Sequence, residues 1–188
     1  MTGRRGTPAQ SPEGVLPPPT SSRAVFDGEI VRLRVSEYTR DDGTVVTREV
    51  LDHNGAVAMI PIEDDHVLMV RQPREAIEEV MLELPAGKLD GPGEDPQAAA
   101  ARELAEEVGR RAETWNYLGG FYMAPAMLTE FIHLYLCTDL SPYALEADED
   151  ERIEVVRVPL AAVPTMIERT RDAKTLIGLL RLARFLSI

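Results

Sequence analysis

Glu103 and Glu107 stand four residues apart, and their type and spacing could bind a metal ion. In a helix, residues four apart project from the same face, and Glu106 would lie on the flank of that face. Like charges at this spacing slightly destabilise a helix unless a cation lies between them. Carboxylate oxygens select Mg²⁺ or Mn²⁺ over zinc, and Mg²⁺ usually bridges them to substrate phosphates. The spacing indicates a magnesium site, and a solvated acidic helix face is the alternative interpretation.

The sequence around these glutamates favours the metal site. A glycine-rich loop, residues 87–94, leads directly into the segment that carries them. Arg102 can pair with Glu106 or Glu94 and so orient their carboxylates. The segment before the loop ends in Leu-Pro-Ala, so the backbone carbonyls near Ala86 can point at the same metal. An acidic chain that binds an anionic substrate also needs such a cation to offset repulsion.

This segment resembles the Nudix box, whose pattern is G-x5-E-x7-R-E-U-x-E-E-x-G-U, with U an aliphatic residue. The residues that match in register are Glu94, Arg102, Glu103, Leu104, Glu106, Glu107 and Gly109. There are two departures. The interval from Gly87 to Glu94 is one residue longer than the pattern, which lengthens the loop before the helix. Arg110 stands where an aliphatic residue is expected, which affects packing after the helix rather than the metal-binding face.

The resemblance implies both the reaction and the roles of the residues. The reaction is hydrolysis of the pyrophosphate bond in a nucleoside diphosphate derivative, with Mg²⁺ as cofactor and Mn²⁺ able to replace it. Glu103 and Glu107 would be metal ligands, and the Ala86 carbonyl would be another. Glu106 would ligate or support the metal, and Arg102 would position the carboxylates.

Other segments are similar to the ADP-ribose pyrophosphatase branch of the Nudix hydrolases, which implies the products AMP and ribose 5-phosphate. These segments are residues 70–74 (VRQPR), residues 82–87 (LELPAG) and residues 124–130 (APAMLTE). Pro125 falls sixteen residues after Gly109, where the branch carries a proline, and Glu130 ends the same loop. By the resemblance, both contact substrate. Ala126 replaces the usual glycine, so the loop must differ here if that glycine needs positive φ.

Arg48 and Arg74 match positions that contact substrate in this branch. A guanidinium group can bind phosphate bidentately or stack on adenine. The alternative for either arginine is an ion pair at the surface.

A second acidic cluster, residues 146–151, precedes Ile153. The resemblance implies that Glu151 binds metal and that Glu149 is the general base, which takes a proton from the attacking water. Neighbouring carboxylates could exchange these roles, and for most of the cluster the alternative is a solvated loop.

Strands dominate the middle of the chain and helices are few, which predicts a layered α+β fold. The expected strands are residues 30–35, 45–51, 56–60, 66–70, 81–84, 117–123, 131–137 and 153–158. The expected helices are residues 96–108, 160–170 and 174–186. Asp95 suits the cap of the first helix, Pro96 its first position and Gly109 its end.

The expected organisation is a flexible tail over residues 1–22, an N-terminal hairpin region over residues 23–54, and a Nudix hydrolase domain over residues 55–188. The resemblance implies an α/β/α sandwich with a mixed central sheet. It also implies a homodimer in which the N-terminal hairpin reaches across to the partner. A hairpin alone is marginal in water, so something must pack on it.

Composition excludes several classes of function. The 188 residues carry a net charge of −12, which argues against nucleic acid as a partner because phosphate backbones are bound through basic patches. No apolar stretch approaches the roughly 20 residues of a membrane helix. The single cysteine, Cys137, lies in an apolar run, is interpreted as a small buried hydrophobe, and is compatible with the cytoplasm.

Two rival functions remain open. One is a Nudix hydrolase for another NDP-sugar or a dinucleotide polyphosphate, with the same box and a different pocket. The other is a nucleotide-binding regulator that has lost catalysis, against which the presence of Glu103, Glu106 and Glu107 argues. A turnover assay separates the two classes.

Overall fold

The structure is a computed structural model of the chain, and it describes residues 14, 16–28, 31–91, 93–145 and 152–187. The chain divides into two compact units. The first comprises Met1–His53 together with Ala126–Leu128, and the second comprises Asn54–Pro125 and Thr129–Ile188.

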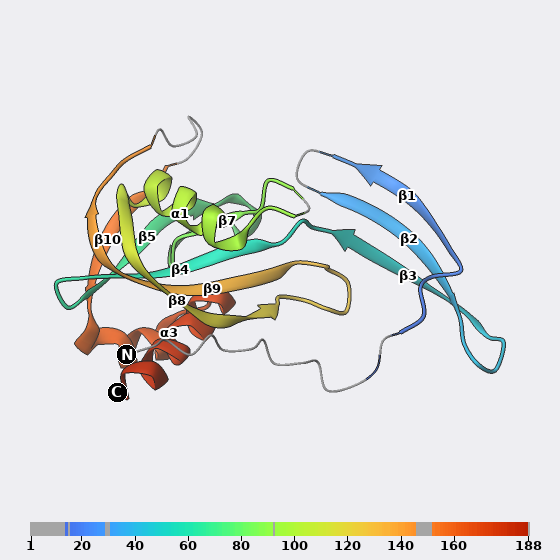
Figure 1. Cartoon of the computed structure of the whole chain (residues 1–188). Coiled ribbons are helices and arrows are strands. Elements are labelled where there is room, and N and C mark those ends of the chain that lie inside the picture. Colours follow the sequence, from blue (N-terminus) through green and yellow to red (C-terminus); the bar gives the residue numbers. More distant parts are fainter. Residues whose placement is uncertain (1–13, 15, 29–30, 92, 146–151, 188) are drawn as a thin grey trace. The chain divides into compact units, whose positions relative to one another are not determined.

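The first unit is built on a three-stranded antiparallel sheet with the order β1 (Ser21–Asp27), β2 (Arg32–Thr39) and β3 (Val45–Asp52) (Figure 1). The predicted hairpin is confirmed as β2 and β3, whose turn has Gly43 at a φ of 83°. β1 was not predicted and begins two residues inside the range expected as a tail. The Leu51 amide donates to the Met127 carbonyl at 2.7 Å, which ties residues 126–128 to β3.

The second unit contains a seven-stranded mixed sheet with the main order β10-β5-β4-β9-β8. β6 pairs with β5, and β7 pairs with β4. β4 and β9 are parallel and the other pairs are antiparallel, so the mixed sheet expected from the resemblance is confirmed. The strands are β4 (Ala56–Glu63), β5 (His66–Arg74), β6 (Glu79–Glu83), β7 (Ala86–Lys88), β8 (Arg110–Tyr122), β9 (Phe131–Pro142) and β10 (Glu154–Pro159).

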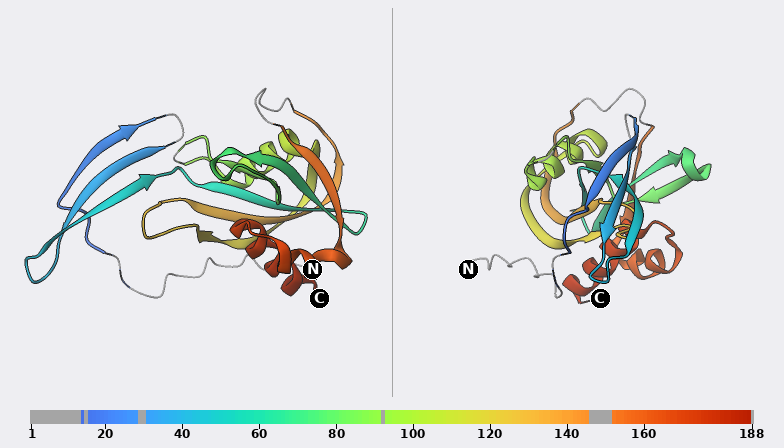
Figure 2. Two further views of the ribbon diagram at one scale, coloured as in Figure 1. Left: turned by 180° about the vertical axis from the view of Figure 1, so that it is seen from behind. Right: turned by 90° about the vertical axis from the view of Figure 1, so that its right-hand side faces the viewer.

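Helices cover both faces of this sheet. Successive side chains of β4 point to opposite faces, so its buried residues alternate between two cores. Val57 and Met59 pack with Leu104 of α1 (Pro96–Glu107). Ala58 and Ile60 pack with residues of α3 (Ala173–Leu186). The views in Figures 1 and 2 place α1 and α3 on opposite sides of the sheet. The predicted α/β/α sandwich is therefore confirmed.

The helix boundaries follow local signals. The Asp95 side chain accepts a hydrogen bond from the Ala98 amide at 3.1 Å and so caps α1, while Gly109 ends it with a φ of 67°. The segment predicted as a helix from residue 160 begins with a 3₁₀ turn (Leu160–Ala162) and becomes α2 (Val163–Arg169), with Pro164 in its first turn. A further 3₁₀ turn, Glu75–Ile77, joins β5 to β6.

Three strands extend well beyond their predicted ends: β5 continues to Arg74, β9 continues to Pro142, and β8 differs most. β8 begins at Arg110, whereas the sequence predicted a strand only from residue 117. Arg110 opens the strand by donating from Nε to Glu63 at 2.8 Å, so the residue that departs from the Nudix box serves as an ion-pair partner. The polar residues that follow hide the apolar signal of a strand.

Cys137 is fully buried in the core beneath α1, as expected for a small hydrophobe. Burial raises the pKa of its thiol far above the ordinary range. None of the described helices is long and apolar enough to span a membrane.

Candidate active site

Arg102 on α1 lies at the centre of a cluster of carboxylates. Its Nη1 donates to Glu103 at 2.9 Å and to Glu106 at 3.0 Å. Its Nη2 donates to the Lys88 carbonyl at 3.2 Å. The same nitrogen lies 3.6 Å from Asp90 and 3.7 Å from Glu94. The predicted pairing of Arg102 with Glu106 and Glu94 is thus present, and Glu94 reaches the cluster despite the extra loop residue.

Four carboxylates therefore approach one guanidinium group, which neutralises one of their charges. Burial opposes the charge on Arg102, but the carboxylates of Glu103, Asp90 and Glu106 outweigh it and raise the pKa of Arg102 above its ordinary value. The Nε atom of Arg102 is buried without a partner among the described residues. A cluster with this excess of negative charge is suited to binding a cation.

Glu103 lies against the backbone of Gly87 at the start of the loop. A Cβ atom placed on Gly87 would lie 1.8 Å from the Glu103 carboxyl carbon. The carboxylate thus occupies space that any other residue at position 87 would fill. This close approach explains the glycine at the first position of the box.

Glu107, one turn further along α1, is only 7% exposed. Its Oε2 accepts a hydrogen bond from the Ala86 amide at 3.0 Å. Ala86 begins β7, which pairs with β4. Four of the residues that the sequence predicted around a metal, Ala86, Glu103, Glu106 and Glu107, are thus connected through Arg102 and through the backbone of residues 86–87.

These donors fit a hard divalent cation, since they are carboxylate and backbone oxygens. Among the described residues, however, no three His, Cys, Asp or Glu side chains are gathered closely enough to hold one. Glu103 and Glu106 instead direct a carboxylate oxygen each to Arg102. Glutamate side chains are flexible, so short rotations would bring these oxygens together around a cation.

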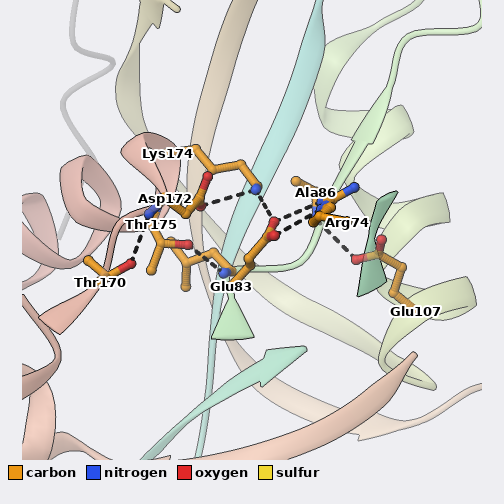
Figure 3. A network of polar contacts seen from close by, with 9 residues as sticks. Arg74, Glu83, Ala86, Glu107, Thr170, Asp172, Lys174 and Thr175 are labelled. Carbon is orange, nitrogen blue, oxygen red and sulfur yellow. Dashed lines mark hydrogen bonds and ion pairs between the residues drawn. The ribbon is translucent and has the colours of Figure 1, made fainter. Parts of the chain in front are cut away.

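Arg74 has a partner that the sequence did not predict. Its Nε and Nη2 donate to the two oxygens of Glu83 at 2.8 and 2.7 Å (Figure 3). Lys174 of α3 also donates to Glu83. Burial by itself would raise the pKa of Glu83, but its bonds to Arg74 and Lys174 outweigh burial and lower that pKa. Glu83 alternates with Leu82 and Leu84 along the strand, a pattern typical of an exposed side chain, so the local sequence carries no signal of this buried carboxylate.

The remaining predicted residues lie elsewhere. Arg48 belongs to the first unit, on β3, and donates to its neighbouring Thr47 carbonyl at 2.8 Å. Pro125 and Glu130 belong to the second unit, in the connection between β8 and β9. Glu149 and Glu151 lie outside the described residues.

The loop around Pro125 differs from the family pattern in one respect. Ala126 is not among the described residues with positive φ, so its backbone needs no glycine. The Met123 amide donates to the Glu130 carbonyl at 3.3 Å and closes the part of the loop that lies in the second unit.

Comparison with known proteins identifies relatives over most of the chain. The NUDIX domain family matches residues 52–178. The methanol dehydrogenase activator of Bacillus methanolicus is 38% identical over 159 residues, covering 82% of this chain and 85% of that protein. The ADP-ribose pyrophosphatase of Bacillus subtilis (strain 168) is 36% identical over 156 residues, covering 80% and 84%. A crystal structure of an ADP compounds hydrolase superposes with a TM-score of 0.82 at 29% identity, covering 93% of this chain and 97% of that one.

Proposed function

Because the chain belongs to the NUDIX family, we propose that it hydrolyses the pyrophosphate bond of ADP-ribose to give AMP and ribose 5-phosphate. The observation that carries this proposal is the cluster of box carboxylates that Arg102 and the Ala86 amide hold on one end of α1. The choice of ADP-ribose is supported by the similarity to the Bacillus subtilis enzyme of that name.

The cofactor in this proposal is Mg²⁺, which Mn²⁺ can replace. Glu103, Glu107, the Ala86 carbonyl and Glu151 would hold it, and it would supply charge neutralisation on the phosphate oxygens. Arg102 holds Glu103 and Glu106 in place, so it acts by orienting carboxylates rather than by touching the phosphate. Glu106 supports the same arrangement.

Proton transfer in this proposal belongs to Glu149, which would take the proton from the attacking water as it adds to phosphorus. The described residues on either side of the loop that contains Glu149 contact α1 or the core beneath it. The Leu145 amide donates to the Ala105 carbonyl at 3.2 Å, and Ile153 packs on the core beneath that helix. These contacts support the assignment of the base to this loop.

Substrate binding is proposed for Arg74, Arg48, Pro125 and Glu130. Arg74 is the best supported of these residues. Glu83 accepts from Nε and Nη2 on one edge of its guanidinium group, and Nη1 lies on the other edge. A guanidinium group fixed on one edge by a carboxylate is pre-organised to bind a phosphate with the other. Its side chain is 39% exposed, so a ligand can reach it.

We further propose a cytoplasmic homodimer, with the tail, hairpin region and hydrolase domain divided after residues 22 and 54. The exposed apolar residues of β1 support a partner for the first unit, since Val25 and Phe26 are 50% and 58% exposed. Gel filtration with light scattering tests this: a monomer at micromolar concentration would contradict it.

A turnover panel tests the function. ADP-ribose, ADP-glucose, GDP-mannose, NADH and diadenosine polyphosphates would each be supplied with Mg²⁺, and we expect the highest kcat/KM for ADP-ribose. A higher value for another compound moves the assignment to that substrate, and no turnover of any would favour a binding protein.

A single substitution tests the site itself. Glu107→Gln keeps the size of the side chain, and we expect it to lower kcat by about 100-fold or more with the fold intact, since it removes one metal ligand. Glu113→Gln is the matched control, because Glu113 is an exposed carboxylate of β8. Equal activity of the two variants would refute the assignment of Glu107.

A further inference from the structure

Glu83 is held by cations from two directions. Its carboxylate is 2% exposed and lies at the end of β6. Arg74 of β5 binds both of its oxygens, and Lys174 in the first turn of α3 binds Oε2 (Figure 3). Asp172 then accepts from Lys174 at 3.0 Å. Two carboxylates thus balance two cations, which is the condition under which such charges can be buried.

The N-terminus of α3 holds the backbone next to Glu83 as well. Asp172 caps the helix by accepting from the Thr175 amide at 3.0 Å. Thr175 is fully buried, and its hydroxyl oxygen accepts from the Leu84 amide at 2.8 Å. The Leu84 side chain packs against the same helix, since a Cβ on Gly178 would lie 2.3 Å from it. One turn of α3 therefore fixes both the Glu83 carboxylate and the Leu84 backbone.

The next two residues carry this constraint to the candidate active site. The Pro85 carbonyl accepts from the Met59 amide of β4 at 2.9 Å. The Ala86 amide donates to Glu107 of α1 at 3.0 Å. Consecutive residues 84, 85 and 86 are thus bound to α3, to the sheet and to α1 in turn. Only Pro85 lies between Leu84 and Ala86, so a displacement of the Leu84 backbone would be passed on to the Ala86 amide, which donates to Glu107.

Stability alone is a weak reason for this arrangement. Replacing a buried ion pair by apolar residues of similar volume is often neutral or stabilising. The first turn of α3 instead reaches two groups of the proposed active site: the Arg74 guanidinium through Lys174 and Glu83, and the Ala86 amide through the Thr175 hydroxyl and the Leu84 backbone.

We propose that Lys174 and Thr175 are positioning residues for catalysis. Lys174 acts through Glu83 on Arg74, and Thr175 acts through Leu84 on the Ala86 amide and Glu107. This inference rests on the proposed function, because Arg74 binds substrate and Glu107 binds metal in that proposal. In this role each acts through its hydrogen-bond partner, Glu83 or Leu84, rather than by contact with the substrate.

The two residues should have different kinetic signatures. Lys174→Met removes the charge at similar length, and we expect KM for ADP-ribose to rise about tenfold with a smaller change in kcat. Thr175→Val removes the hydroxyl at constant volume, and we expect the Mg²⁺ concentration for half-maximal rate to rise about tenfold. Lys174→Arg and Thr175→Ser retain the charge and the hydroxyl, so each should recover most of the loss.

Controls separate positioning from simple stability. Arg184→Met removes a cation from the exposed part of the same helix and should leave KM and kcat unchanged. Lys174→Met should change KM less than about threefold when introduced into Glu83→Gln, because both act on one contact. Additive effects in this double-mutant cycle would overturn the role of Lys174. So would a lowered Tm with unchanged kinetics at a temperature where each variant is folded.

Manganese binding gives a readout that needs no turnover. Mn²⁺ titration followed by electron paramagnetic resonance should show about tenfold weaker binding for Thr175→Val than for Thr175→Ser. Equal affinities would overturn the role of Thr175. If the wild-type chain failed to hydrolyse ADP-ribose while the two variants still differed in Mn²⁺ affinity, the proposed substrate would be wrong and the positioning role of Thr175 would stand.

Discussion

Gly87→Ala is expected to abolish most activity while leaving the fold nearly unchanged. The added Cβ would lie 1.8 Å from the Glu103 carboxyl carbon and 2.0 and 2.2 Å from its oxygens. These atoms are the far end of a flexible side chain, so they can rotate away without moving the backbone. Gly87 does not require a positive φ, so the clash with Glu103 is the cost that the substitution brings.

The size of the effect follows from the distance that Glu103 must move. An ordinary contact to a Cβ begins at 3.4 Å, so the carboxyl carbon must retreat by at least 3.4 − 1.8 = 1.6 Å. Metal–ligand distances tolerate only about 0.2 Å, and a misplacement of about 1 Å can cost roughly 100-fold in rate. We therefore expect kcat to fall by about 100-fold, equivalent to about 2.7 kcal/mol in the activation barrier.

Steady-state hydrolysis of ADP-ribose across a Mg²⁺ titration measures this loss, with Tm measured in parallel. Gly91→Ala is the matched control in the same loop, because a Cβ there would meet nothing within 4 Å and φ is not positive. Wild-type kcat in Gly87→Ala would refute the placement of Glu103 at the metal. A drop in Tm as large as that of a core substitution would refute the claim that only the tip of Glu103 moves.

Three further predictions concern stability and reactivity. Asp172→Ala should lower the unfolding free energy by about 1–2 kcal/mol, because it removes the α3 cap, whereas Asp172→Asn should lose less; urea denaturation measures both. The pKa of Glu83 is lowered in the fold, so its stabilising contribution is fully present above the unfolded-state pKa of about 4.3 and is lost as pH falls through the lower folded value. The unfolding free energy of the wild type should therefore fall more steeply than that of Glu83→Gln as pH drops below about 4.3. Parallel plots of unfolding free energy against pH would contradict this. Cys137 should resist thiol reagents at neutral pH until the protein is unfolded, since burial raises the pKa of its thiol; rapid labelling of the native chain would show that the strand opens.

The helix α1 could be predicted from the sequence because its signals are local. Asp95, Pro96 and Gly109 mark its ends at the positions that the structure shows. The spacing of Glu103 and Glu107 likewise follows from helical geometry alone. The sequence of β4 is one apolar run, which is typical of a strand buried on both faces. Its alternate residues pack in two cores, Val57 and Met59 in one and Ala58 and Ile60 in the other.

What the sequence could not indicate depends on residues far apart along the chain. Glu83 is stabilised in its buried position by Arg74, 9 residues away, and by Lys174, 91 residues away. β1 was missed because all of its residues are exposed, so it is defined by its pairing with β2 rather than by an apolar pattern. The first part of β8 was missed for a similar reason, since Arg110 is stabilised by the distant Glu63.

The charges near the site indicate how an acidic protein can bind a diphosphate. The chain carries a net charge of −12, and two arginines beside the candidate site, Arg102 and Arg74, are already paired with carboxylates. Arg102 faces four of them, and Arg74 is bound on one edge by Glu83. Binding a doubly charged substrate to this surface without a further cation would bring like charges together. Substrate affinity should therefore depend on the divalent ion and on the edge of Arg74 that Glu83 does not engage, because Arg102 is already surrounded by carboxylates.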